Sequence, residues 1–273
     1  MASTDPAPRP VFRLEGTDLR GSLSDDRLVT AIKAAVFQHG VVCIPGQGSV
    51  SAHELAAFAD RIGTLLTSAD SPFLSRSSDW VHDTLDGVWL AGNVDRHGGI
   101  HSDLRRSEYW HHDNDWANEK LRRIFNVLHT VVLPDTPGST GFIDVRHMRE
   151  TLTPAEGELL RDATTTLLLA DIADYDVAHS GHIPPSKHSV LSTHPVSGLP
   201  VTYMSGGTIT LASGVTVPAV SIIAPILDRQ PLIIHDWAPG DVLVWDNLSV
   251  MHRSMGGFSG TRLLYSARSI WEA

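Results

Sequence analysis

Two histidines and one aspartate carry the strongest chemical signal in this sequence. His111 and Asp113 stand two positions apart, and in an extended chain residues i and i+2 point to the same face. The imidazole and the carboxylate would then meet at one point, with the intervening His112 facing away. The pair has little specificity alone, because the chain contains 15 histidines and 31 acidic residues. A metal site therefore needs a third ligand from another part of the chain.

His252 is the candidate for that third ligand. A Pro-Gly turn at residues 239–240 leads into the apolar segment 241–245. A second turn follows at Asp246, and His252 starts the returning strand. Two imidazoles and one carboxylate form the facial triad of non-haem Fe(II) oxygenases, in which a bidentate 2-oxo acid and dioxygen take the open positions. Zinc can use the same three ligands with a water as the fourth, so the triad alone leaves a zinc enzyme open.

Arg262 distinguishes between these two kinds of metal enzyme. A buried guanidinium presents a planar fork that binds a carboxylate in a bidentate manner, as the distal end of 2-oxoglutarate requires. An ordinary zinc hydrolase has no such requirement. Thr140 lies in the small-residue segment 137–142, where its hydroxyl could approach the same carboxylate, although taken alone it is a turn residue. The combination favours Fe(II) with 2-oxoglutarate.

Ordered motifs extend this pattern over most of the chain. They are GVVCIPGQ at 40–47, FADRIG at 58–63, WHHD at 110–113, GST at 138–140, STHPVSG at 192–198 and GDVLVWDN at 240–247, followed by His252 and Arg262. With these motifs the sequence resembles the taurine dioxygenase and 2,4-dichlorophenoxyacetate dioxygenase family of Fe(II)/2-oxoglutarate oxygenases. The resemblance implies a mainly β fold with flanking helices, a double-stranded β-helix (jelly roll, cupin-like) with iron at one mouth. It also implies His111, Asp113 and His252 as Fe(II) ligands, Thr140 and Arg262 as 2-oxoglutarate contacts, and O2 as the second co-substrate.

Departures from the family pattern bear on the substrate. Members that act on sulfonates or other acids often have a second arginine four residues beyond the co-substrate arginine, and Ser266 holds that position here. The departure argues against taurine as the substrate. The candidates for substrate contacts flank the metal motifs or match them in strand parity, and they are Asn93, His112, Asn114, Trp116, Met204 and Arg268.

The expected activity is that of an Fe(II)/2-oxoglutarate-dependent dioxygenase, an oxidoreductase. It would couple oxidative decarboxylation of 2-oxoglutarate to hydroxylation of a small-molecule metabolite, in specialised biosynthesis or in nutrient scavenging. Desaturation, cyclisation and oxidative cleavage can use the same iron site, whereas halogenases of this type have a small residue where this chain has Asp113. Two alternatives stay open, namely a zinc metalloenzyme with the same His/Asp/His site and a jelly-roll binding protein without turnover.

Composition limits the class of protein. With 273 residues, 42% of them hydrophobic and 19% charged, the chain is expected to form one globular domain over 11–273 after a disordered leader at 1–10. The net charge of −10 and the lack of a dense basic run argue against nucleic acid. Cys43 is the single cysteine, so no disulfide forms within the chain. Without a signal peptide or an 18-residue apolar run, a cytoplasmic protein with no membrane partner is expected. A homo-oligomer remains open, as dimers and tetramers are common in the resembling family.

Periodicity predicts the order of the elements. A helix capped by Ser24 precedes a buried strand at 40–46, and a second helix covers 51–63. Residues 64–108 are expected to be mostly loop, including a lid. Short strands follow at 125–133, 141–145, 190–193, 201–204, 232–234, 241–245 and 262–271, interrupted by one helix that begins near Thr153.

Overall fold

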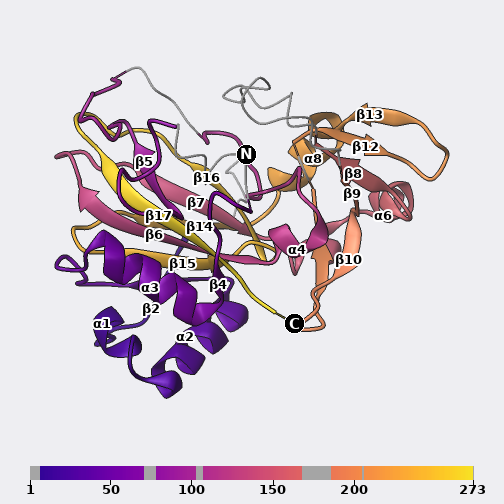
Figure 1. Cartoon of the computed structure of the whole chain (residues 1–273). Coiled ribbons are helices and arrows are strands. Elements are labelled where there is room, and N and C mark those ends of the chain that lie inside the picture. Colours follow the sequence, from indigo (N-terminus) through magenta and orange to yellow (C-terminus); the bar gives the residue numbers. More distant parts are fainter. Residues whose placement is uncertain (1–6, 71–77, 103–106, 168–185, 205, 273) are drawn as a thin grey trace.

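Two β-sheets form the centre of the structure, a computed structural model that describes residues 7–70, 78–102, 107–167, 186–204 and 206–272 (Figure 1). The larger sheet has seven strands. In spatial order they are β2 (Phe12–Arg13), β3 (Val41–Ile44), β15 (Val242–Asp246), β6 (Ile124–Val132), β17 (Leu263–Ile270) and β4 (Thr64–Leu65), with β5 (Val88–Gly92) paired to β17. The smaller sheet consists of β1 (Arg9–Pro10), β14 (Leu232–Asp236), β7 (Ser139–Asp144) and β16 (Val250–Ser254).

Further strands and helices flank these two sheets. A four-stranded sheet contains β13 (Thr216–Pro218), β12 (Thr208–Thr210), β8 (Thr164–Thr166) and β9 (Lys187–Ser189), and β10 (Leu191–Thr193) pairs with β11 (Pro200–Thr202). The helices are α1 (Leu19–Ser22), α2 (Asp26–His39), α3 (Ala52–Ile62), α4 (Glu119–Arg122), α5 (Met148–Thr151), α6 (Pro154–Leu160) and α8 (Ala219–Leu227). Of these, the β8, β9, β12 and β13 strands and the helices α1, α4, α5 and α8 were not predicted.

Apolar side chains of the two central sheets share one interior. Phe142 and Ile233 of the smaller sheet pack in the same buried cluster as Leu243, Trp245 and Leu264 of the larger sheet. Alternation along a strand sends every second side chain to this interior, which is how two sheets pack face to face. Two facing sheets with flanking helices are the double-stranded β-helix that the sequence predicted.

Helices α2 and α3 lie together beside the larger sheet (Figure 1). Ile32 of α2 and Phe58 of α3 belong to the same buried cluster as Val42 of β3 and Val244 of β15. Burying side chains of this size stabilises the fold by roughly 1.5–3 kcal/mol each. The helices thus anchor the sheet that carries β15 and β17.

The starts of the helices follow their capping residues. The Ser24 cap was wrong by one residue, because Asp25 caps α2 and its carboxylate accepts the N–H of Leu28 at 3.3 Å. A carboxylate at a helix N-terminus also interacts favourably with the helix dipole, whereas a serine hydroxyl offers only the hydrogen bond. Ser51 and Thr153 cap α3 and α6, each in a capping box with a glutamate three residues later, and both helices begin where the sequence predicted.

The prediction of a mostly irregular segment at 64–108 was wrong for two stretches. β4 pairs with the end of β17, and β5 pairs with β17 along its whole length. The sequence did not reveal β5, because this strand has only five residues and lies between two residues that disfavour strands, Gly87 and Asn93. Residues 71–77 and 103–106 of this stretch lie outside the described residues, so the lid stays a prediction.

The N-terminal leader was also wrongly interpreted in part. Arg9 and Pro10 pair in parallel with β14 of the smaller sheet, and β2 pairs in parallel with β3 of the larger sheet. Val11 between them is buried. Arg9 and Pro10 therefore belong to the fold, and residues 1–6 of the leader lie outside the described residues.

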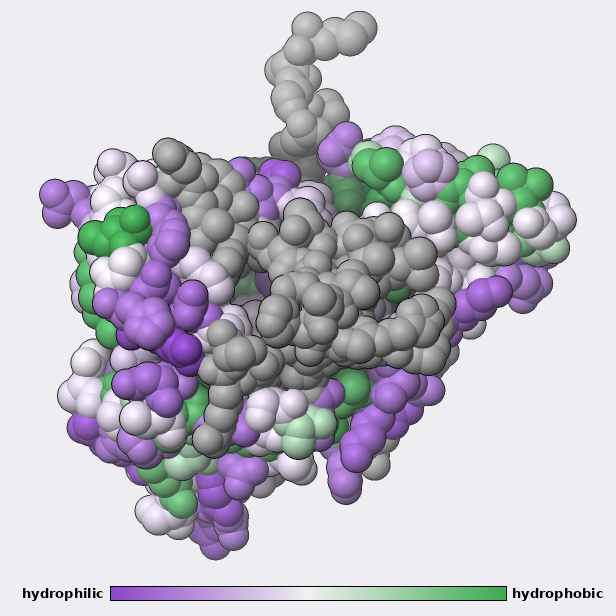
Figure 2. All heavy atoms as spheres, turned by 45° about the horizontal axis from the view of Figure 1, so that its top comes forward, coloured by the Kyte–Doolittle hydropathy of each residue, from purple (hydrophilic) through white to green (hydrophobic). Residues whose placement is uncertain are grey.

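The described surface is largely polar on the face seen in Figure 2, with apolar atoms in separate small patches. Exposed apolar side chains include Val215 and Val220. Among the described residues, no helix combines the length and apolar character needed to cross a membrane.

Candidate metal centre

Backbone pairing brings His111 and His252 side by side. The N–H of each donates to the carbonyl of the other, at 3.1 and 3.0 Å, which forms an antiparallel bridge between the loop before α4 and strand β16. Residues directly opposite each other in such a pair point to the same face, and the two imidazole centroids lie 4.3 Å apart. The backbone itself therefore sets the relative position of the two histidines.

Asp113 completes a cluster with these two imidazoles. One ligand atom from each of the three residues lies within 4.8 Å of the others. His111 Nδ1 lies 2.8 Å from the carbonyl oxygen of Tyr109, which assigns the ring proton to Nδ1 and leaves a lone pair on Nε2. His252 Nε2 lies 3.7 Å from Asp113 Oδ2. The arrangement is the facial triad that the sequence predicted.

The protonation states of the cluster suit a cation. Burial, with the neighbouring His111, holds the pKa of His252 well below its usual range, so its ring is neutral at neutral pH. Burial alone would raise the pKa of Asp113, but Arg268 and the neighbouring imidazoles together outweigh burial, and the pKa lies below its ordinary value. A neutral imidazole and an ionised carboxylate are the forms that bind metal.

Asn247, which sequence analysis missed, holds the backbone of Asp113. Its Oδ1 accepts the Asp113 N–H at 2.8 Å, and its Nδ2 donates to the Asp113 carbonyl at 2.8 Å. The Asn247 carbonyl lies 2.6 Å from His112 Nδ1, and the His112 ring stacks on Tyr203 at 4.4 Å. His112 thus faces away from the cluster. The only local signal for Asn247 was its place in the turn after β15.

Trp237 contacts both Thr140 and Arg262. The indole N–H of Trp237 donates to Thr140 Oγ1 at 3.0 Å, and Arg262 Cζ lies 5.9 Å from a Trp237 ring centroid. Thr140 also stands two positions from Phe142, the cross-strand partner of His252. The predicted co-substrate residues and the triad therefore line one interior between the two sheets.

Arg262 is a buried cation that has no anionic partner among the described residues. Its side chain is only 5% exposed, its Nε has no hydrogen-bond partner, and no salt bridge joins it to a described carboxylate. Burial alone lowers the pKa of Arg262 to about 10. An uncompensated buried charge is costly unless a ligand pairs with it. The distal carboxylate of 2-oxoglutarate has the charge and the planar shape that fit this guanidinium.

Asn93 supports Arg262 from behind. Its Oδ1 accepts the Arg262 backbone N–H at 2.9 Å, and its Nδ2 donates to the Gly260 carbonyl at 3.1 Å. Both ends of the amide are used by the protein, and the side chain is buried. This position suits a residue that orients Arg262 better than one that contacts substrate.

The other substrate candidates are not gathered on one open surface. Met204 and Trp116 are buried apolar residues, and His112 is packed on Tyr203. Asn114 adopts a positive φ of 57° and donates to the Leu121 carbonyl at 2.8 Å, as expected of a turn residue. Arg268 binds the carboxylate of Asp113. Short sequence distance from the metal motifs was therefore a poor guide to exposure.

A second group of potential ligands lies deeper in the interior. Cys43, His235 and Asp241 also have ligand atoms within 4.8 Å of one another. Arg13 already brings a positive charge to this group, 3.7 Å from Cys43 Sγ and 3.9 Å from Asp241 Oδ1. Burial raises the pKa of the Cys43 thiol to about 12. Because the thiol stays protonated and the carboxylate is paired with Arg13, we interpret this group as a structural network and not as a metal site.

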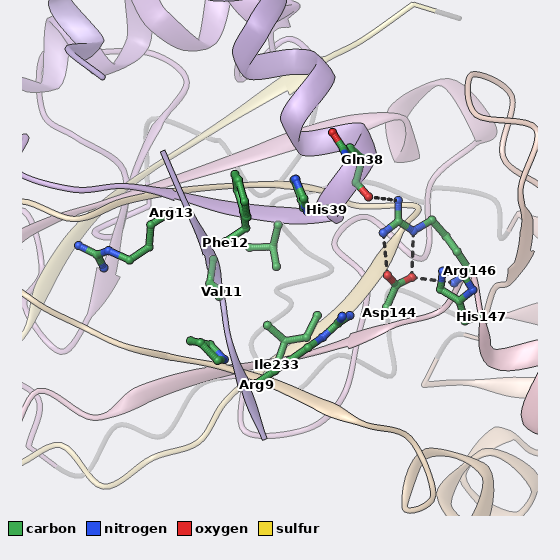
Figure 3. A pocket seen from close by; sticks show the side chains of 12 residues that line it. Arg9, Val11, Phe12, Arg13, Gln38, His39, Asp144, Arg146, His147 and Ile233 are labelled. Atoms are coloured by element: carbon green, nitrogen blue, oxygen red, sulfur yellow. Dashed lines mark hydrogen bonds and ion pairs between the residues drawn. The ribbon is translucent and has the colours of Figure 1, made fainter. Parts of the chain in front are cut away.

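A surface groove of about 460 Å³ lies beside the N-terminal strands (Figure 3). Arg9, Phe12, His39 and Arg146 line it, and none of the triad residues does. Both oxygens of the Asp144 carboxylate are bound by Arg146, at 2.9 and 2.6 Å. The groove is separate from the metal centre.

A double-stranded β-helix that holds two imidazoles, one carboxylate and a buried arginine with no carboxylate partner among the described residues defines a 2-oxoglutarate-dependent oxygenase. The family model for the taurine catabolism dioxygenase TauD, TfdA family matches residues 3–268, and the chain belongs to this family. The predicted enzyme class is confirmed, and with it Fe(II), 2-oxoglutarate and O2 as the cofactor and co-substrates. The zinc alternative finds no support.

Relatives are similar to this chain in sequence, and solved structures are similar to it in fold. The chain is 26% identical over 266 residues to the alpha-ketoglutarate-dependent 2,4-dichlorophenoxyacetate dioxygenase of Cupriavidus pinatubonensis, covering 89% of each chain. It is 22% identical over 254 residues to the (S)-phenoxypropionate/alpha-ketoglutarate-dioxygenase of Delftia acidovorans, covering 84% of this chain and 82% of the relative. The fold matches AAD-2 in complex with Mn(II) and N-oxalylglycine with a TM-score of 0.77 at 19% identity, over 98% of both chains. A taurine dioxygenase from Burkholderia xenovorans matches with a TM-score of 0.72 at 19% identity, over 97% of this chain and 89% of that one.

Proposed function

We propose that this protein oxidises a C–H bond of a small organic molecule at an iron held by His111, Asp113 and His252. The convergence of their three ligand atoms within 4.8 Å carries the proposal. The donor set is that of a non-haem Fe(II) site with three open positions. When bound, Fe(II), 2-oxoglutarate and O2 supply the oxidising chemistry, in which one oxygen atom enters the substrate, the other enters succinate, and CO2 is released.

The residues of the chain bind and orient the reactants. Arg262 would pair with the distal carboxylate of 2-oxoglutarate through two parallel N–H donors. Thr140 already accepts the Trp237 N–H, so its own hydroxyl proton can be donated to the same carboxylate. The rings of Trp237 and Phe258 lie 5.9 and 5.2 Å from Arg262 Cζ and keep water from the ion pair. Asn93 fixes the backbone from which Arg262 projects.

The substrate class is the finer part of the proposal. Two relatives are named for aryloxyalkanoic acids, which makes these compounds the first to be tried. Neutral aryl ethers belong in the same screen, because Ser266 replaces the second arginine of acid-binding members and Arg268 is paired with Asp113. Hydroxylation is the outcome we expect, detected as one succinate released for each oxidised product.

An anaerobic titration tests the iron and co-substrate sites. Addition of Fe(II) and 2-oxoglutarate to the metal-free protein should produce a weak visible charge-transfer band that requires both additions. His252→Ala should abolish the band, whereas His53→Ala, which removes an exposed imidazole on α3, should leave it unchanged. A band that survives in His252→Ala, or tight zinc binding with no band at all, would contradict the proposal.

A further inference from the structure

Both oxygens of the Asp113 carboxylate have their own donor. Arg268 Nη2 donates to Oδ1 at 3.0 Å. With the Asn126 amide oriented so that its oxygen accepts the Trp245 indole N–H at 3.0 Å, its nitrogen donates to Asp113 Oδ2 at 2.8 Å. Oδ2 is the oxygen that lies 3.7 Å from His252 Nε2. The carboxylate is therefore held in one rotation about its own axis.

The two donors are neighbours in the larger sheet. Arg268 of β17 and Asn126 of β6 are directly paired in the antiparallel register, so their side chains leave the sheet on the same face. Arg268 is packed over Trp89, with Cζ 5.0 Å from a ring centroid, and its side chain is 16% exposed. The position of the guanidinium is thus fixed by the sheet and by an aromatic wall.

We propose that Arg268 keeps Asp113 a one-oxygen ligand. This inference rests on the proposed iron site. A guanidinium 3.0 Å from Oδ1 occupies that oxygen with a charge-assisted hydrogen bond. Oδ2 has only the neutral Asn126 amide as its donor and lies toward His252, so Oδ2 is the oxygen that can bind a metal. A carboxylate that bound through both oxygens would fill one of the three positions that the bidentate 2-oxo acid and O2 need. Arg268 is on this account a positioning residue that keeps the third position open.

Charge adds a second reason for this role. The positive charge of Arg268 attracts the Asp113 carboxylate across the 3.0 Å contact, which strengthens the hydrogen bond that holds Oδ1. Ligands bound to a metal are commonly oriented by such hydrogen bonds, and loss of the partner costs roughly 10–100-fold in affinity or activity. Arg268 has no described carboxylate partner other than Asp113, which concentrates the effect on that one residue.

The test counts water molecules on Mn(II) bound to the protein. Broadening of the Mn(II) electron paramagnetic resonance lines in ¹⁷O-enriched water reports the number of bound waters, and the wild type should hold about three, one for each open position. Arg268→Met should hold one fewer, because Asp113 can then chelate. Arg268→Lys should restore the wild-type number, since an ammonium can also occupy Oδ1. N-oxalylglycine should bind Mn(II)-loaded Arg268→Met roughly 10-fold or more weakly than wild type.

Controls separate this inference from the proposed function. Arg253→Met removes a cation next to His252 that packs over Trp110 with Cζ at 4.7 Å, and it should keep the wild-type water number. Arg268→Ala serves as a second variant if Arg268→Met does not fold. An unchanged water number and unchanged N-oxalylglycine affinity in the Arg268 variants would overturn the role of Arg268 alone. Failure of the wild type to bind Mn(II), or equal binding by His252→Ala, would instead refute the iron site.

Discussion

Replacing Arg262 by Met should weaken 2-oxoglutarate binding without destabilising the ligand-free protein. The two effects have one cause, because the guanidinium is buried and has no described anionic partner. A pKa lowered from 12.5 to about 10 corresponds to roughly 3 kcal/mol of cost for the charged form in the folded protein. Methionine has a similar reach and no charge, so the variant avoids that cost.

The loss of affinity follows from the ion pair that the variant cannot make. Truncating one partner of a buried, hydrogen-bonded charge pair costs about 2–5 kcal/mol, which raises the dissociation constant roughly 30-fold to several thousand-fold. Anaerobic titration of the charge-transfer band measures the dissociation constant, and urea unfolding of the ligand-free protein measures stability. Arg262→Lys keeps the charge but not the planar fork, so its affinity for 2-oxoglutarate should lie between that of the wild type and that of Arg262→Met.

The reasoning would be refuted if Arg262→Met bound 2-oxoglutarate within about threefold of wild type. It would also be refuted if the ligand-free variant lost several kcal/mol of stability, because the arginine would then have an internal partner that the geometry does not contain.

Three further predictions concern stability and geometry. His194→Ala should cost about 1.5–3 kcal/mol in urea unfolding, because it removes a 2.9 Å hydrogen bond to the fully buried Asp246 carboxylate and leaves only the Ser249 hydroxyl and the Leu248 N–H as donors. His53→Ala should cost little. Gly92→Ala should reduce 2-oxoglutarate affinity by about 100-fold, since φ is +122° and a Cβ would lie 2.1 Å from the Arg262 carbonyl oxygen; wild-type affinity would argue against this placement. Burial lowers the pKa of His112 to about 3 and that of His188 to about 4. Between pH 6.5 and about 4 these imidazoles are protonated in the unfolded chain but neutral in the folded protein, so the free energy of unfolding should fall as the pH drops. The slope should be about 1–3 kcal/mol per pH unit after the opposite contribution of Asp115, whose pKa burial raises to about 7, and His188→Gln should flatten it.

The sequence predicted those parts of the candidate site that depend on the local geometry of the chain. A two-residue spacing in an extended segment placed His111 and Asp113 on one face, and a turn signal placed His252 on a returning strand. A co-substrate with a distal carboxylate then requires a buried arginine, and Arg262 is buried without a carboxylate partner among the described residues. These inferences needed only chain periodicity and ligand chemistry.

What sequence reasoning missed depends on contacts between distant segments. Asn247 and Asp113 are 134 positions apart, and Arg268 and Asp113 are 155 positions apart. No periodicity encodes such a pair, because the partner is chosen by the tertiary arrangement, which for Arg268 is the register of β6 and β17. Asn93 was predicted to contact substrate, but the fold shows that both ends of its amide serve the loop around Arg262.

The N-terminal segment also has a consequence for solubility. Strand β1 covers the outer edge of β14, and β2 covers the outer edge of β3, with only Val11 between them. An uncovered strand edge presents unpaired N–H and C=O groups that recruit strands from other molecules. Two short strands thus shield one edge of each sheet, and a chain that begins after Arg13 should self-associate through β3 and β14 even though its metal ligands are all retained.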